Sequence, residues 1–341
     1  MPPGKLTRGL FAAGSRFLGC PIPIVCGAMT WVSEPRLVAA VCNEGAFACL
    51  AGGSAPADIL LAQVEETRRL TQAPFGVNVI TISPAYREQL AMLLRHPVPF
   101  VVFAGGIPKD EDIGAVKETG ARAICFAPTA SLAKRLVSAG ADALVLEGRE
   151  AGGHVGPVAL NILLQQILFL DLPVPVFVAG GLWSGRLCAH MFLMGAAGVQ
   201  LGTRFAASTE SCAHEKFKRA YLEASARDAV VTPQFDRRIP VTPVRALRND
   251  ACEDFDKLQL EMIGRLNISE LSREQVQAQL EQFWTGGLRR AVKYGDVASG
   301  SVMAGQSVGL ITRIESVHDI LADLLDGIET ELQVVQNRLN S

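Results

Sequence analysis

A glycine-rich stretch around His154 carries the residues best suited to chemistry. It runs from Glu147 to Gly156 and follows an apolar run, Ala143-Leu144-Val145-Leu146, that is typical of a buried strand. We therefore expect His154 in a loop of small residues just past a strand end. Gly152 and Gly153 allow positive φ and let a flat ligand come close, and a histidine can exchange a proton near neutral pH. The alternative is a tight turn whose histidine faces solvent, because glycine-rich turns are common.

Length and composition indicate a globular protein with a sizeable core. The chain has 341 residues, 49% of them hydrophobic and 19% charged, with a formal net charge of −2. Nucleic acid binding would need a clustered Lys/Arg face, which the sequence lacks, and no apolar run is long enough to predict a membrane span. The eight cysteines are scattered without a CxxC pair. We therefore expect reduced thiols, a cytoplasmic protein and no metal site.

Eight short apolar runs alternate with stretches of helical periodicity, such as residues 59–70 and 132–139. This alternation predicts a parallel sheet covered by helices. Eight units favour an α/β fold of the closed (β/α)8 type, the TIM barrel, over an open doubly wound sheet, and no GxGxxG motif follows the first run. The predicted strands are Ile22–Cys26, Ala46–Leu50, Phe75–Val79, Phe100–Ala104, Ala123–Ala127, Ala143–Glu147, Pro175–Ala179 and Gly198–Leu201.

The sequence changes in character after Phe205. Residues 207–295 contain charged helical stretches and no clear barrel unit, so we predict a mostly helical insertion after strand eight. A closing helix is predicted over residues 311–332. The chain would then consist of a barrel domain, residues 1–206 and 296–341, interrupted by the insertion. Loops on the catalytic face carry substrate choice in this fold, so we expect the insertion to act as a substrate lid.

Small and polar residues follow the predicted strands, and in this fold the active site lies at the C-terminal ends of the strands. The turns Gly180-Gly181 and Gly202-Thr203 follow strands seven and eight, where many barrels bind a phosphate through backbone N–H groups. The amide of Asn78 suits the edge of a flavin ring. Each feature alone also fits an ordinary turn or loop. The other candidates for contacts with a planar cofactor are Gly27, Ala28, Met29, Glu147, Gly152, Gly153 and Gln200.

Taken in order, these motifs resemble the FMN-dependent nitronate monooxygenase (2-nitropropane dioxygenase) superfamily and, within it, the FabK-type enoyl-acyl-carrier-protein reductases. The resemblance runs from about Pro21 to Leu325. Its motifs are Gly27–Val32, Phe75–Asn78, Glu147–Gly156, Ala179–Gly181, Gln200–Phe205, Gly295–Val297 and Gly300–Gln306.

The resemblance implies FMN with its phosphate on the two glycine turns and its ring near Ala28, Met29 and Asn78, with His154 over the reacting side. Two reactions compete. In the reductase type, a hydride from NAD(P)H reaches the β-carbon of an enoyl thioester by way of FMN, and His154 assists proton transfer. In the nitronate type, alkyl nitronates are oxidised with O2, and His154 is the base. A third hypothesis is a non-catalytic flavin-binding protein, against which the retained histidine argues.

Three features favour the reductase type. The run Met29-Thr30-Trp31 resembles the Met-Ala-Trp of the reductases, and residues 300–306 fit the same group. Val155 stands where many nitronate enzymes have arginine. We therefore predict an FMN-dependent oxidoreductase that acts on a small-molecule or acyl-thioester substrate. Acyl carrier protein is a possible partner on this prediction, and a homodimer is the expected assembly.

Overall fold

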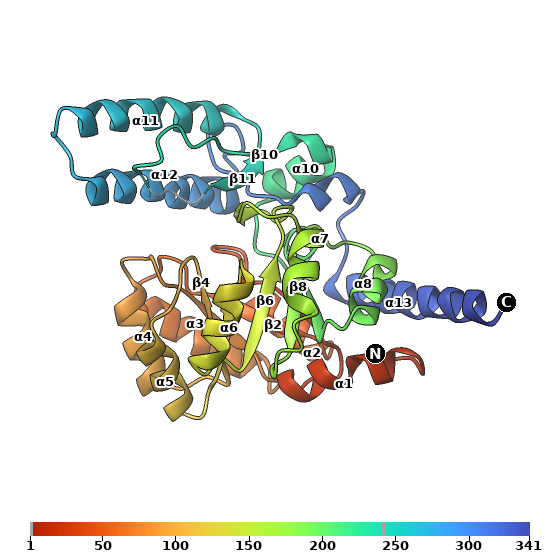
Figure 1. Ribbon diagram of the computed structural model, residues 1–341. Helices are drawn as coiled ribbons and strands as arrows, with labels where there is room; N and C mark the ends of the chain where they lie inside the picture. The colour runs from red at the N-terminus through yellow and green to blue at the C-terminus, as the bar shows by residue number, and fades with distance from the viewer. Residues whose placement is uncertain (1–2, 240–242) are drawn as a thin grey trace.

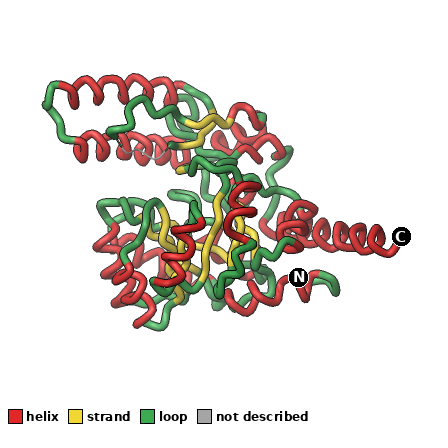
Figure 2. The backbone as a smooth tube through the Cα atoms, in the orientation of Figure 1, coloured by secondary structure: helices red, strands yellow, loops and turns green. Residues whose placement is uncertain are grey.

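The structure is a computed structural model that describes residues 3–239 and 243–341. Eight parallel strands close into a barrel in the order β1-β2-β3-β4-β5-β6-β8-β9, with helices around the outside (Figures 1 and 2). The predicted (β/α)8 fold is confirmed, and each strand lies within two residues of its predicted bounds. The strands are β1 (Ile24–Cys26), β2 (Phe47–Ala51), β3 (Gly76–Ile80), β4 (Phe100–Ala104), β5 (Arg122–Phe126), β6 (Ala143–Glu147), β8 (Val176–Ala179) and β9 (Gly198–Leu201).

The amphipathic stretches between the strands form helices, because each buries one apolar face against the sheet. None of the helices in the described residues is both long and apolar enough to span a bilayer. The helices that surround the barrel before the insertion are α1 (Thr7–Leu18), α2 (Pro35–Asn43), α3 (Ala57–Leu70), α4 (Tyr86–Arg95), α5 (Asp110–Glu118), α6 (Ala130–Ser138), α7 (Leu160–Leu163), α8 (Gly185–Leu193) and α9 (Thr203–Ala206).

The closing helix differs from its predicted bounds of 311–332. It is α13 (Val317–Asn340), and the residues before it include a 3-10 turn, Gln306–Leu310. The helix begins at Val317 because Ser316 caps it: the hydroxyl oxygen accepts a hydrogen bond from the Asp319 N–H at 3.1 Å. The predicted start at residue 311 was wrong because it rested on apolar periodicity alone and did not use the serine cap, which is a local signal.

Side chains from alternate strand positions fill the barrel interior. Phe47, Phe100 and Phe177 are each at most 4% exposed there, and the rings of Phe47 and Phe100 meet edge to face with 5.0 Å between centroids. Phe17 of α1 packs against Phe100 and Phe177 and so closes the N-terminal end. Burying one phenylalanine fully stabilises a fold by roughly 1.5–3 kcal/mol. Space for a ligand therefore lies at the opposite end, where the strands finish.

The insertion after β9 contains helices and a small sheet. It comprises α10 (Glu215–Glu223), β10 (Ala229–Val231), β11 (Val244–Leu247), α11 (Asp250–Asn267) and α12 (Arg273–Tyr294). Figure 1 shows α11 and α12 as a pair above the barrel. The pair has an apolar core of its own, in which Phe255 and Trp284 lie with 4.6 Å between ring centroids. The mostly helical character of the insertion is confirmed, whereas its role as a lid stays a prediction.

Gly153 and His154 differ from the predicted loop. They form a short strand, β7 (Gly153–His154), which pairs antiparallel with β11 so that Val244 lies opposite His154. The loop prediction is wrong at these two positions because the partner strand lies far along the chain, in the insertion. No local pattern reveals such a pairing.

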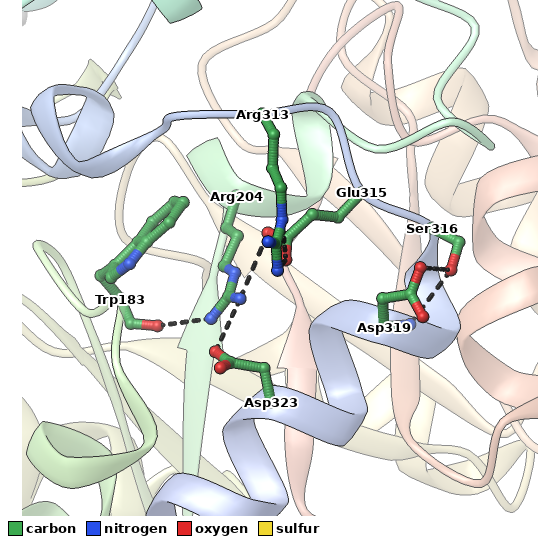
Figure 3. A network of polar contacts seen from close by, with 7 residues as sticks. All are labelled: Trp183, Arg204, Arg313, Glu315, Ser316, Asp319 and Asp323. Atoms are coloured by element: carbon green, nitrogen blue, oxygen red, sulfur yellow. Dashed lines mark hydrogen bonds and ion pairs between the residues drawn. The ribbon is translucent and has the colours of Figure 1, made fainter.

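Arg204 joins the end of β9 to the closing helix (Figure 3). Its guanidinium donates to the Trp183 carbonyl oxygen at 3.0 Å, to Glu315 at 3.2 Å and to Asp323 at 2.7 Å. It also stacks over the Trp183 ring, 4.5 Å from the centroid. The Arg204 and Glu315 side chains are 3% and 8% exposed, whereas Asp323 is 57% exposed. Arg313, at 3.0 Å, is a second partner of Glu315.

We expect Arg204→Met to lower the free energy of unfolding by about 3 kcal/mol, because it removes the buried partner of Glu315 and three hydrogen bonds. The matched change Asp323→Asn should cost less than about 1 kcal/mol, since that carboxylate is largely in water. Denaturant unfolding of both variants checks the prediction. Equal losses in the two variants would show that burial does not set the strength of these ion pairs.

Candidate active site

A cavity of about 420 Å3 opens at the C-terminal ends of the barrel strands. The insertion covers its outer side with Phe217 and Tyr221 from α10 and Leu288 from α12. The Tyr221 hydroxyl donates to the backbone oxygen of Met303, another lining residue. Ten of the predicted site residues line this cavity: Ala28, Met29, Asn78, Glu147, Gly152, Gly153, His154, Gln200, Gly202 and Thr203.

Three predicted residues, Gly27, Gly180 and Gly181, do not line the cavity. Gly180 and Gly181 have positive φ values of 99° and 71°. A Cβ on Gly180 would lie 2.8 Å from the backbone of Gly148, and one on Gly181 would lie 2.9 Å from Cβ of Glu150. Packing therefore explains why these two positions are glycine: the turn after β8 lies directly against the loop after β6. Their contact with a phosphate stays a prediction.

The floor of the cavity carries three polar side chains from three strands: Asn78 of β3, Glu147 of β6 and Gln200 of β9. The Asn78 amide nitrogen donates to the Val102 carbonyl oxygen at 3.1 Å, which leaves the Asn78 amide oxygen free to accept. Among the described residues the carboxyl group of Glu147 has no hydrogen-bond or ion-pair partner, and burial raises its pKa to about 8. At neutral pH this group is therefore mostly a neutral acid, able to donate a hydrogen bond.

His154 lies at the side of the cavity and is held by the insertion. Its Nε2 lies 3.2 Å from Oε2 of Glu281, on α12, and the two side chains are 30% and 25% exposed. The neighbouring Val155 N–H donates to the Pro243 carbonyl oxygen at 2.9 Å, next to β11. The pairing of β7 with β11 thus fixes the backbone of His154, and the contact with Glu281 fixes its ring. The carboxylate beside Nε2 orients the ring.

Glu281 is a functional candidate that the sequence analysis missed. It follows Leu280, which with Val276 and Trp284 forms the buried stripe of α12. A glutamate beside an apolar stripe is ordinary on an amphipathic helix. Only the folded pairing of β7 with β11 brings it to His154, so no local signal could have found it.

The segment after the insertion forms a wall of the cavity. Met303 and Ala304 line it, and the Gly305 N–H donates to the Thr203 hydroxyl oxygen at 3.0 Å. A Cβ on Gly152 would lie 2.5 Å from the backbone of Ala304. The motif at residues 300–306 is thus packed against the glycine-rich stretch before His154. Thr203 keeps its hydroxyl hydrogen free to donate.

The cavity lining contains few charged side chains. Among the residues that line the cavity there is no lysine or arginine, and Arg149 is exposed outside it. Across the described ranges, no three His, Cys, Asp or Glu side chains gather as a metal site requires. The eight cysteines are free thiols. The arrangement offers hydrogen-bond donors and acceptors, one imidazole and one neutral acid.

A barrel with a cavity at the C-terminal ends of its strands has the architecture in which (β/α)8 enzymes carry their active sites. The chain belongs to the nitronate monooxygenase family, whose model matches residues 14–89 and 80–327. The resemblance seen in the sequence is therefore confirmed. This is a family of FMN-dependent oxidoreductases, and the protein is an oxidoreductase.

Three relatives illustrate the range of the family. The (3aS,4S,5R,7aS)-5-hydroxy-7a-methyl-1-oxo-octahydro-1H-indene-4-carboxyl-CoA dehydrogenase of Mycobacterium tuberculosis is 35% identical over 71% of this chain and 67% of its own. The structure of FabK from Thermotoga maritima is 35% identical, with a TM-score of 0.85 over 95% of this chain and 98% of that one. The nitroalkane oxidase of Streptomyces ansochromogenes is 28% identical, with a TM-score of 0.78 over 95% and 99%.

Proposed function

We propose that this protein binds FMN in the barrel cavity and uses NAD(P)H to reduce the double bond of an unsaturated acyl thioester. The observation that carries the proposal is the lack of any lysine or arginine in the cavity lining. An anionic nitronate buried there would need a nearby cation to offset its desolvation. A neutral thioester has no such need.

The residues of the cavity fit FMN. The free Asn78 amide oxygen and the unpaired Glu147 carboxyl are a hydrogen-bond acceptor and donor without a protein partner on the cavity floor. With the Gln200 amide they would hold the polar edge of the ring. Gly202 and Thr203, at the start of α9, would hold the phosphate through backbone N–H groups and the free hydroxyl. When bound, FMN supplies a hydride carrier between NAD(P)H and the substrate.

An apolar wall suits the rest of the substrate. It is formed by Ile80 and Phe126 at the ends of β3 and β5, by Ile107 and Pro128 in the loops after β4 and β5, and by Leu132 of α6. Ile107 is also 52% exposed, so the wall reaches the protein surface. An acyl chain could bury apolar area there while its thioester lies near His154. One relative is named as a carboxyl-CoA dehydrogenase, which supports an acyl thioester as the substrate class, and the structural similarity to FabK agrees with it.

His154 would polarise or protonate the acyl end of the substrate, and Glu281 would orient the imidazole. General acid catalysis of this kind contributes typically about 10²–10⁴-fold in rate. The acyl carrier, coenzyme A or acyl carrier protein, stays a prediction, as do the homodimer and the cytoplasmic location.

Nitronate oxidation is the second candidate, and the family match favours it. A histidine next to a carboxylate can equally act as a base for the α-proton of a nitroalkane. The third hypothesis, a flavin-binding protein without catalysis, has no support from these relatives, which are named as enzymes.

The substrate class is tested by anaerobic reduction of the purified protein with NADH or NADPH, followed by mixing with a medium-chain 2-enoyl-CoA. We expect prompt return of the oxidised flavin absorbance with the enoyl thioester. Propyl nitronate, added to oxidised protein without NAD(P)H, should reduce the flavin slowly or not at all. Fast reduction by propyl nitronate, combined with no reoxidation by the thioester, would overturn the proposal in favour of the second candidate.

The cofactor site is tested by filling it. Gly202 has φ −113°, and a Cβ there would meet only Met29 at 3.5 Å, so Gly202→Leu should fold but place its side chain in the cavity. We expect the purified variant to have lost most of its flavin absorbance per protein. Gly114→Leu is the matched control, because a Cβ at Gly114 meets open space, and it should keep full FMN. A Gly202→Leu protein saturated with FMN would contradict the placement.

The roles of His154 and Glu281 are separable by half-reaction. In His154→Ala, FMN content and flavin reduction by NAD(P)H should be kept, while turnover of the enoyl substrate should fall by about 10²–10⁴-fold. Glu281→Gln keeps a hydrogen-bond partner for the ring but removes the charge, so we expect a smaller loss, about tenfold in kcat, with KM little changed. Stopped-flow measurement of each half-reaction decides this. Wild-type turnover in His154→Ala would show that the histidine is structural.

A further inference from the structure

The side chain of Glu147 stands on top of the filled barrel interior. Ala143 and Val145 of the same strand belong to the interior cluster, and strand residues two apart point to the same face. Glu147, the last residue of β6, therefore points inward as well. Its register partner on β8 is Ala179, another interior residue. The carboxyl thus lies on an apolar floor, facing the cavity.

Within the described part of the chain no charged group offsets the burial of this carboxyl; the buried guanidinium of Arg245 on β11 donates instead to the backbone oxygens of Ala229 and Arg149. In its own loop, Arg149 is exposed, and the Glu150 carboxylate accepts the Leu160 N–H at 3.1 Å. The neighbouring strands β5 and β8 contribute Phe126 and Ala179. The titratable groups on the other cavity walls are Cys49 of β2, Tyr221 of α10 and His154 of β7.

None of those three groups supplies a fixed positive charge to Glu147. Burial raises the pKa values of Cys49 and Tyr221 above their usual ranges, so both stay protonated and neutral. His154 has its own carboxylate partner, Glu281. A carboxyl desolvated without a cation is favoured in its neutral form, which agrees with the raised pKa of about 8 for Glu147.

We propose that Glu147 is a redox-linked proton acceptor: its neutral carboxyl donates a hydrogen bond to the bound cofactor, and its ionised form takes up a proton whenever the cofactor is reduced. This inference rests on the proposed FMN site. The cavity has no cation to offset the negative charge that reduction adds. A carboxylate in the same low-dielectric space would repel that charge, so Glu147 binds a proton instead.

The proton balance follows from the ionisation state of Glu147. Below its pKa, reduction brings two electrons and one proton to the cofactor, and Glu147 keeps the proton that it already has. Above that pKa, the same two electrons are accompanied by two protons, one to the cofactor and one to the carboxylate. Each proton taken up with two electrons changes the reduction equilibrium tenfold per pH unit, which is about 30 mV.

The experiment measures the midpoint reduction potential of the FMN-loaded protein against pH, from about pH 7 to about pH 10, with dithionite as reductant and redox dyes as mediators. We expect a slope of about −30 mV per pH unit near neutrality that steepens toward about −60 mV above the pKa of Glu147. Glu147→Gln keeps a neutral donor but cannot ionise. It should hold FMN and show the shallow slope throughout.

His154→Gln is the matched control and should keep the steep segment, since Glu147 is intact. Loss of the steep segment in His154→Gln, or its survival in Glu147→Gln, would assign the proton to another group and overturn the inference. A wild-type slope that stays shallow over the whole range would overturn it without any variant. In each case the protein still holds reducible FMN. Failure of the proposed cofactor site looks different, because the purified protein would then bind no flavin.

Discussion

The filled interior of the barrel is the constraint on which the rest of the structure depends. Gly198 of β9 faces Phe177 so closely that a Cβ there would lie 2.5 Å from the ring. With the interior occupied in this way, polar inward side chains have room only on the side of the cavity, where Asn78, Glu147 and Gln200 stand. The packed side chains that fill the barrel interior also form the apolar surface beneath Glu147. They desolvate its carboxyl group and so raise its pKa.

The insertion completes this site from above. The pairing of β7 with β11 fixes the backbone of His154, and Glu281 of α12 reaches its ring. Both contacts come from one segment of chain that has its own small core. Glu281, which contacts the imidazole, and Leu288, which lines the cavity, thus lie on the same helix, α12.

The strands and most of the cavity lining could be predicted because their signals are local. Continuous apolar runs predicted the barrel strands. Asn78 and Gln200 lie near the ends of their predicted strands, and this position predicted that they line the site. Glu281 could not be found, since its role depends on a pairing between distant segments. In the sequence, Gly180 and Gly181 fitted a phosphate-binding turn as well as a closely packed turn. Only the close approach to Gly148 and Glu150 in the structure shows that packing requires glycine there. Sequence reveals candidates for a site more readily than it reveals what each candidate touches.

One position shows how a shared barrel can serve two substrate classes. Val155 lines the cavity next to His154, is 3% exposed, and is fixed through its N–H by the Pro243 carbonyl. The nitronate enzymes that the sequence resembles often have arginine at this point. A guanidinium there would bring to the lining the cation that this cavity lacks, and an anionic substrate could then be buried at acceptable cost. With valine the lining keeps no positive side chain, which suits the neutral acyl group that we propose as the substrate.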